Sequence, residues 1–277
     1  MPSGSTIQLP VTKVNAAIST IADDVLASEE PLEIRLEHNA DGLVAQKTIS
    51  VTMRTPGNDL ELATGFLFTE GIIASKDEIE MKPGSGGANN NIITVSIKAG
   101  IDIDIKKLER HFYTTSSCGV CGKTSIEAIK TVCKLSETAN DAQYPAALIR
   151  SLPEKLRYGQ DIFERTGGLH ASALFDGTGK LILLREDVGR HNALDKLIGA
   201  ALLAGMLPLH EHILLLSGRI SFELVQKAAM AGIKMITAIG APSSLAVETA
   251  AAFDMTLIGF LRDQRFNIYS GAQRIVI

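Results

Sequence analysis

Two cysteines in a glycine-rich loop are the residues of this sequence best suited to covalent chemistry. Cys118 and Cys121 are separated by two residues, and a glycine follows each of them. Glycine adopts backbone turns that are closed to other residues, so a reacting molecule can approach either sulfur closely. Lys123 and the N-terminus of the helix expected after it favour the thiolate, which is the nucleophilic form. The loop therefore predicts nucleophilic sulfur chemistry.

Several kinds of site use such a cysteine pair, and we favour a persulfide carrier among them. A structural zinc site takes four ligands, commonly from two such pairs, and neither Cys133 nor the isolated histidines have ligand spacing, so no metal site is predicted. A thioredoxin-like redox pair stays open, although no thioredoxin-type βαβ pattern surrounds the motif. A purely structural turn also stays open. Cys133 falls in a helical pattern, for which a buried and inert thiol is expected.

Arg190 and His191 form a second candidate site, because they open a predicted helix directly after Gly189. The free N–H groups of a helix N-terminus bind anions, so the pair predicts a phosphate or pterin contact. The alternative is a solvated helix start that Asp187 caps. His191 and Asp195 are four residues apart and share a helix face, and either of them could be structural.

Arg219 and Arg265 each follow a predicted strand in the second half of the chain. In open α/β sheets ligands bind at the carboxyl ends of the strands, so both arginines are predicted anion contacts. The alternative for Arg219 is a surface ion pair with Glu223. His170 follows two glycines, and it either lines the same site or is a core histidine with its hydrogen bonds satisfied.

The composition is that of an ordinary globular protein. The 277 residues carry a formal net charge of −4, without the basic bias that would predict nucleic-acid or membrane binding. Three cysteines argue against a secreted disulfide scaffold, and the first residues lack the pattern of a signal peptide. The longest uncharged apolar stretch, 198–209, is well short of the roughly 18 residues that span a bilayer. We therefore expect a cytoplasmic protein.

The first half of the chain is expected to hold two regions. Residues 1–30 are polar and weakly patterned, which predicts a loose arm, and residues 31–140 predict an α+β domain that carries the cysteine loop. Asn58 and Glu61 have the spacing of an N-cap and its capping glutamate, which predicts a helix to about residue 69. Strands are predicted where apolar and polar residues alternate or β-branched residues gather, at 32–37, 43–53 and 92–98. A polar stretch at 140–145 is the candidate boundary.

Residues 141–277 predict an α/β domain with a mixed or parallel sheet that helices cover on both faces. Short apolar strands that alternate with helices are typical of this class. A hairpin is predicted over 171–185, further strands at 213–216, 234–239 and 256–261, and helices at 190–205, 221–232 and 243–253.

Five motifs in one order resemble the formate dehydrogenase accessory sulfurtransferase family, FdhD. The motifs are Ser117–Gly122 (SCGVCG), Thr166–Ala171 (TGGLHA), Glu186–Lys196 (EDVGRHNALDK), Ser217–Lys227 (SGRISFELVQK) and Leu245–Glu248 (LAVE). They extend from Cys118 to about Phe260, and weaker similarity begins near Asp59, so the resemblance covers most of the chain. A single CxxC is a weak signal, whereas five ordered motifs are a strong one.

This resemblance implies a function that the composition does not show. The family takes sulfur from a cysteine desulfurase as a persulfide and delivers it to the molybdenum cofactor, in its bis(guanine dinucleotide) form, for formate dehydrogenase. Cys118 matches the persulfide cysteine and Cys121 the second cysteine. A cytidine-deaminase-like C-terminal core and a homodimer are also implied, with the desulfurase and the formate dehydrogenase catalytic subunit as partners. The alternative is a non-catalytic cofactor-binding chaperone whose cysteines sense redox state.

The family's cofactor-binding segment follows the last core strand. It corresponds here to Phe260, Leu261, Arg262, Asp263, Gln264 and Arg265. Many members have Cys, Lys, Pro and Gly at the four inner positions, which this sequence replaces, whereas Phe260 and Arg265 match. Arg262 partly restores the positive charge.

A deaminase-like core does not imply deaminase activity. Zinc deaminases need an H-x-E motif followed by P-C-x-x-C. In this sequence the only CxxC precedes His170, and Ser172 stands where the catalytic glutamate would be needed. The sequence therefore argues against deamination, and the fold alone would mislead.

Overall fold

The protein is described by a computed structural model that covers residues 4–40, 43–80, 91–101, 142–262 and 264–277. The predicted sulfur site, Cys118 and Cys121, lies outside these residues. So do Cys133, the helix expected after the cysteine loop, and Asp263.

A six-stranded mixed sheet forms the centre of the C-terminal half, as the sequence predicts. Its strand order is β13-β12-β11-β10-β8-β9. The strands are β8 (His170–Phe175), β9 (Leu181–Asp187), β10 (Ile213–Leu216), β11 (Met235–Ala238), β12 (Thr256–Arg262) and β13 (Arg265–Ser270). Strands β10, β11 and β12 run parallel, and the remaining pairings are antiparallel. The carboxyl ends of three neighbouring strands therefore meet at one edge.

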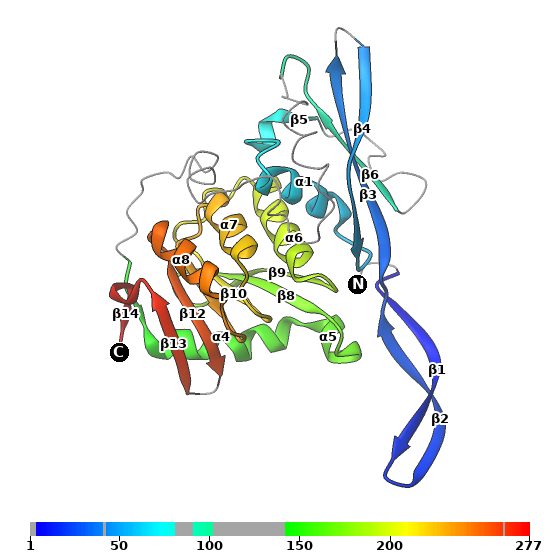
Figure 1. Cartoon of the computed structure of the whole chain (residues 1–277), viewed down its shortest axis with the longest axis vertical. Coiled ribbons are helices and arrows are strands. Elements are labelled where there is room, and N and C mark those ends of the chain that lie inside the picture. The colour runs from blue at the N-terminus through cyan, green and yellow to red at the C-terminus, as the bar shows by residue number, and fades with distance from the viewer. Residues whose placement is uncertain (1–3, 41–42, 81–90, 102–141, 263) are drawn as a thin grey trace.

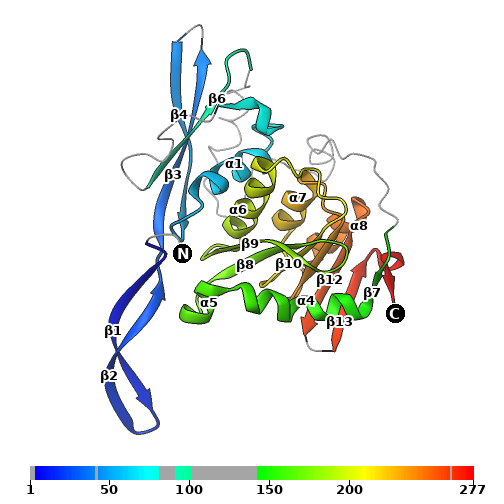
Figure 2. The same cartoon turned by 180° about the vertical axis from the view of Figure 1, so that it is seen from behind.

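Helices cover both faces of this sheet (Figures 1 and 2). One face carries α6 (Arg190–Leu203), α7 (Phe222–Met230) and α8 (Ser244–Ala252), and the other carries α4 (Ala146–Gly159), which α5 (Asp161–Thr166) follows. Side chains of a strand alternate between its two faces. Accordingly Leu214 and Leu216 belong to one buried cluster, whereas Ile213 and Leu215 belong to the other. The predicted fold class is confirmed.

In the described residues before 102, the chain contributes a second sheet and an α-helix. The sheet has the order β4-β3-β6-β5, with β3 parallel to β6. The elements are β3 (Glu30–Ala40), β4 (Leu43–Arg54), α1 (Asp59–Thr69), the short 3₁₀ helix η1 (Lys76–Glu78), β5 (Ile79–Glu80) and β6 (Ile92–Ile97). Of these elements β3, β4, β6 and α1 match the predicted segments, whereas η1 and β5 were not predicted. At the C-terminus, η2 (Ala272–Arg274) and β14 (Ile275–Val276) follow, and β14 pairs with β7 (Tyr144–Pro145).

The start of α1 differs in detail from the expected capping box. Asn58 has a left-handed backbone with φ 58° and makes no side-chain cap hydrogen bond. Glu61 instead accepts hydrogen bonds from the Arg185 guanidinium on β9. The glutamate therefore joins the two halves of the molecule, where the sequence predicted a local role.

Helices α1 and α6 touch along a seam that two glycines make possible. A Cβ atom on Gly65 would lie 1.9 Å from the Asp195 carbonyl oxygen, and one on Gly199 would lie 1.9 Å from the Glu61 carbonyl oxygen. Any side chain at either position would therefore collide with the backbone of the other helix. A single buried cluster includes residues of β3, α1, α6 and α7, so the hydrophobic core is continuous across the two halves.

A buried ion pair crosses the same seam. The Lys227 ammonium on α7 lies 3.0 Å from an Asp195 carboxylate oxygen on α6 and donates to Thr69 Oγ1 on α1 at 2.9 Å. Burial works to lower the pKa of Lys227, but the charges of Asp195 and Glu70 outweigh it and raise that pKa. Lys227 is therefore held charged among carboxylates inside the protein.

The first region is a hairpin, and the prediction of a loose arm was wrong. Strands β1 (Thr6–Asn15) and β2 (Ile18–Ala27) pair along their whole length as an antiparallel hairpin. Figure 1 shows it projecting from the body as a continuation of the β3–β4 ribbon. Several of its apolar side chains stay exposed, including Val14, Ile18 and Ile21. In the part of the chain that the structure describes, no helix is long and apolar enough to cross a membrane.

Candidate functional site

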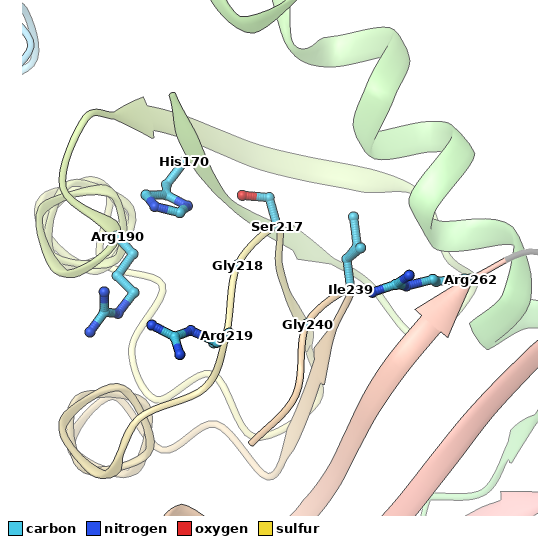
Figure 3. Close-up of a pocket in the computed structure, with 8 residues that line it drawn as sticks. All are labelled: His170, Arg190, Ser217, Gly218, Arg219, Ile239, Gly240 and Arg262. Atoms are coloured by element: carbon cyan, nitrogen blue, oxygen red, sulfur yellow. The ribbon is translucent and has the colours of Figure 1, made fainter. Parts of the chain in front are cut away.

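A pocket opens at the carboxyl ends of β10 and β11, where the sequence predicted an anion site (Figure 3). Its volume is about 310 Å³. The residues that line it are His170, Arg190, Ser217, Gly218, Arg219, Ile239, Gly240 and Arg262. They come from five places in the fold: the start of β8, the start of α6, the segments after β10 and β11, and the end of β12.

Glycine backbone forms the middle of the pocket. The Gly240 N–H donates to the Gly218 carbonyl oxygen at 3.1 Å, which joins the segments that follow β10 and β11. A Cβ atom on Gly240 would lie 2.6 Å from that oxygen, so a side chain there would push the two segments apart. The Gly240 carbonyl oxygen accepts from the Phe260 N–H at 3.0 Å, which brings in β12. Close approach of the three strand ends thus depends on glycine.

Three arginines surround this backbone. In Figure 3, Arg190 and Arg219 lie on one side of the two glycines and Arg262 on the other. None of the eight lining residues is acidic. Within the described part of the chain, none of the three guanidinium groups has a hydrogen bond or an ion pair, and Arg190 Nε is buried without a partner. The pocket therefore presents positive charge that the described residues leave uncompensated.

The ion pair suggested as the alternative for Arg219 does not form. Glu223 Oε2 instead lies 2.9 Å from His191 Nε2. His191 Nε2 also lies 3.2 Å from Ser221 Oγ. His191 is thus bound to the start of α7 and is not among the residues that line the pocket. Of the two residues predicted to open α6 with an anion contact, only Arg190 lies in the pocket.

Asp187 has a larger role than the predicted helix cap. Its Oδ1 accepts from the Gly189 N–H at 2.8 Å, within the corner that leads into α6. Its Oδ2 lies 2.7 Å from the Lys196 ammonium, and both side chains are almost completely buried.

His170 lines the pocket as a half-buried and uncharged imidazole. Burial lowers the pKa of His170, and the charges of Arg190 and His191 lower it further, against a smaller opposing effect of Asp187. A Cβ atom on Gly218 would lie 3.0 Å from His170 Nδ1, so the glycine leaves room for the ring. Ser217 holds the two strands together here, because its Oγ accepts from the Ala171 N–H at 2.8 Å. A neutral imidazole can donate or accept one hydrogen bond at each nitrogen without adding charge.

The segment 260–265 divides between core, surface and pocket. Leu261 is 1% exposed and belongs to the cluster beneath α4, whereas Phe260 is 37% exposed. Arg262 lines the pocket. Arg265 is opposite Arg262 in the register of β12 and β13, but it is exposed and does not line the pocket. Gln264 is exposed in the turn between these strands. Asp263 lies outside the described residues.

Sequence reasoning missed four lining residues, all of which stand directly after strands. Ser217 and Gly218 follow β10, and Ile239 and Gly240 follow β11. The signal was present, because each pair ends an apolar run with a glycine. The residues predicted at this edge, Arg219 and Arg262, are both charged, whereas these four are uncharged.

Known proteins are similar to this chain in sequence and in fold. The FdhD/NarQ family model matches residues 27–276. A protein of Mycolicibacterium paratuberculosis named "Sulfur carrier protein FdhD" is 48% identical over 271 residues, 96% of this chain and 97% of the relative. A protein of Sulfolobus acidocaldarius with the same name is 42% identical over 268 residues, 97% of this chain and 98% of the relative. A crystal structure from Desulfotalea psychrophila, provisionally named a formate dehydrogenase accessory protein, superimposes with a TM-score of 0.73 at 25% identity, over 98% of this chain and 99% of that one.

Proposed function

The chain belongs to the FdhD/NarQ family, and we propose that it carries sulfur from a cysteine desulfurase to the molybdenum cofactor of a formate dehydrogenase. Curated relatives that match nearly the whole chain are named sulfur carrier proteins, which supports the carrier role. The observation that supports the cofactor as the acceptor is the pocket, whose three arginines have no partner among the described residues and whose lining includes no acidic residue. In this proposal the cofactor is the substrate, in its bis(guanine dinucleotide) form.

The pocket has the chemistry that a nucleotide diphosphate requires. An arginine guanidinium is a planar fork of donors that matches phosphate oxygens, and such charge-assisted hydrogen bonds are about twice as strong as neutral ones. Arg190, Arg219 and Arg262 would hold the diphosphate of a guanine nucleotide. The volume of about 310 Å³ lies at the lower end of ligand pockets, which suits one nucleotide portion of the cofactor. The neutral imidazole of His170 adds a hydrogen-bonding group to the pocket without adding charge.

Sulfur loading would take place on Cys118. Its thiolate attacks the outer sulfur of the desulfurase persulfide, the sulfur–sulfur bond of the donor breaks, and the desulfurase cysteine leaves as a thiolate. Cys118 then carries the persulfide. If the Cys121 thiolate attacks the Cys118 sulfur, the outer sulfur leaves as sulfide and a Cys118–Cys121 disulfide remains. The two cysteines supply the two electrons that reduce the outer sulfur to sulfide.

Loading and binding are separate operations in this proposal, so two variants separate them. We expect Cys118→Ala to gain no sulfur atom from a desulfurase with cysteine in mass spectrometry, while it binds GDP like the wild type. Arg219→Ala should load sulfur normally but bind GDP about tenfold more weakly in calorimetry, the loss expected for a hydrogen bond to a charged group.

Each result has a clear opposite. Persulfide on the Cys118→Ala protein would remove Cys118 from the mechanism. Unchanged GDP affinity in Arg219→Ala would show that this pocket is not the nucleotide site. A wild-type chain that binds GDP but never gains sulfur would be a cofactor chaperone with redox-sensing cysteines, the alternative considered from the sequence. The proposed partners further include the formate dehydrogenase catalytic subunit and, in a homodimer, a second copy of the chain.

A further inference from the structure

A buried ion pair lies directly behind the arginine pocket. The Lys196 ammonium on α6 lies 2.7 Å from Asp187 Oδ2, at the end of β9, and the two side chains are 2% and 0% exposed. Lys196 Nζ also donates to the carbonyl oxygens of Thr55 at 2.8 Å and Glu186 at 3.4 Å. All three donors of the ammonium therefore have acceptors, as a buried charge requires.

The same group fixes the corner that leads into α6. Asp187 Oδ1 accepts from the Gly189 N–H at 2.8 Å, and the Val188 N–H donates to Thr55 Oγ1 at 3.2 Å. The Thr55 N–H donates to Asp187 Oδ2 at 3.1 Å. Val188 and Gly189 are thus hydrogen-bonded to fixed groups on both sides. The next residue is Arg190, which lines the pocket and whose guanidinium has no hydrogen-bond partner among the described residues.

Asn192 completes the connection to the N-terminal sheet. Its Nδ2 donates to the Met53 carbonyl oxygen at 2.8 Å and to Asp187 Oδ1 at 3.1 Å, and its Oδ1 accepts from Thr52 Oγ1 at 3.2 Å. The end of β4 and the start of α6 are therefore one hydrogen-bonded unit. Arg190 belongs to the start of this α6 segment, and no hydrogen bond among the described residues holds its guanidinium.

We propose that Asp187 and Lys196 are positioning residues, which hold the Val188–Gly189 corner against β4 so that Arg190 stands ready for the anion. The inference rests on the proposed function, since it assumes that the pocket binds a nucleotide diphosphate. Preorganised donors bind more tightly than donors that must first be ordered, because ordering a long side chain or a loop costs free energy on binding.

The molecule contains a matched control for this idea. Asp195 and Lys227 also form a buried Asp–Lys pair that joins α6 to the N-terminal half, through Thr69. Neither residue lines the pocket, nor does either bind the corner before Arg190. Both pairs are buried Asp–Lys ion pairs, and each has one member on α6. They differ in that only the Asp187–Lys196 pair contacts the corner that precedes a pocket arginine.

The experiment compares two neutral double variants, Asp187→Asn with Lys196→Met and Asp195→Asn with Lys227→Met. Replacing both members avoids leaving one buried charge without its partner. Stability is measured by thermal unfolding and GDP affinity by calorimetry. We expect GDP affinity to fall about tenfold in the first protein and to stay within about twofold of the wild type in the second, whatever each loses in stability. Equal losses of affinity in both proteins would overturn the positioning role.

A double-mutant cycle, in which the neutral Asp187/Lys196 variant is combined with Arg190→Ala, separates this inference from the proposed function. If the pair acts through Arg190, neutralising it in the Arg190→Ala protein weakens GDP binding no further. Additive losses would overturn the inference. A fully active pocket in Arg190→Ala alone would instead count against the proposed anion site. Should the first double variant fail to fold, Asn192→Ala removes one connection of the same unit and should lower GDP affinity in the same Arg190-dependent way, and an unchanged or Arg190-independent affinity would overturn the proposal.

Discussion

The seam between α1 and α6 and the pocket at the ends of β10–β12 use the same residue types in opposite ways. At the seam, Gly65 and Gly199 remove side chains so that two helices touch, and nearby cations such as Arg185 have carboxylate partners. In the pocket, Gly218 and Gly240 remove side chains where the strand ends meet, and the arginines have no partners in the described chain. A cation with a carboxylate partner inside the fold is already occupied, whereas one without a partner among the described residues is available to an anionic ligand. Substitutions in the two regions should therefore separate stability from binding.

The largest effect on stability is expected from Gly199→Ala at the seam. The new Cβ would lie 1.9 Å from the Glu61 carbonyl oxygen, which is backbone and cannot turn aside, so the helices must separate. We expect a loss of about 3 kcal/mol in the free energy of unfolding, at the upper end of ordinary overpacking. Denaturant unfolding measures this. Gly177→Ala is the control, because its Cβ would meet its nearest neighbour, a Tyr144 ring atom, at an ordinary 3.7 Å; similar losses in both would contradict the steric argument.

Arg54→Met tests a compensated cation. Arg54 is completely buried at the end of β4, where its guanidinium donates twice to the Asp59 carboxylate at 2.9 Å and once to Asn91. Removing it leaves Asp59 without its cation, and we expect a loss of about 2 kcal/mol, discounted from a fully buried pair because Asp59 is partly exposed. GDP affinity of the folded protein should not change. A large loss of affinity with unchanged unfolding would reverse the proposed division between the regions.

Arg262→Ala tests an uncompensated cation, and its neighbour provides the control. Arg262 and Arg265 pair across the β12–β13 turn, both are exposed, and only Arg262 lines the pocket. We expect Arg262→Ala to weaken GDP binding by about tenfold, or about 1.4 kcal/mol, with little change in unfolding. Arg265→Ala should do neither. Calorimetry on both proteins decides, and equal effects would mean that general surface charge, rather than the pocket, attracts the nucleotide.

Much of the C-terminal fold was predictable because its apolar runs are short and glycines or caps bound them. The sheet strands between residues 170 and 262 and the helices α6 to α8 lie where the sequence predicted them. Helix α4 was missed, although Ile149, Leu152 and Leu156 are buried at helical spacing. Its internal Pro153 resembles a helix end in sequence. The β1–β2 hairpin was missed for another reason: much of its apolar surface is exposed, so it lacks the half-buried alternation of a sheet strand.

The site was predictable through its charges and not through its backbone. Arg190 and Arg219 were predicted because they stand at a helix start and after a strand. His170 was predicted because it follows two glycines, and Arg262 because the resemblance placed it in the cofactor-binding segment. The contact between Gly218 and Gly240 depends on the register of two strands about twenty residues apart, which no local pattern contains. The strand register also explains why the side chain of Leu261 is buried. Irregular pairing between Gly259 and Arg262 shifts the alternation of β12, and this sets which side chains enter the core.

The smallest expected effect belongs to His170, the one uncharged titratable group that lines the pocket among the described residues. Its pKa is lowered from 6.5 by burial and by Arg190 and His191, so the folded protein holds fewer protons than the unfolded chain between that lowered value and 6.5. Stability therefore falls as the pH drops through this window. In His170→Gln this part of the pH dependence of unfolding should vanish, which denaturant unfolding on the acid side of neutrality measures. His38→Gln, which removes an imidazole from β3 outside the pocket, is the control and should leave this pH dependence in place.

Binding should move the same group in the opposite direction. A diphosphate between the arginines cancels the repulsion that opposes protonation of His170, so its pKa should rise when GDP binds. The wild type should then take up a fraction of a proton on binding near pH 6, and affinity should increase on acidification. Calorimetry in buffers of different ionisation enthalpy measures that uptake. An equal uptake in His170→Gln would show that the proton goes elsewhere, and the imidazole would then be a wall of the pocket without an electrostatic link to its ligand.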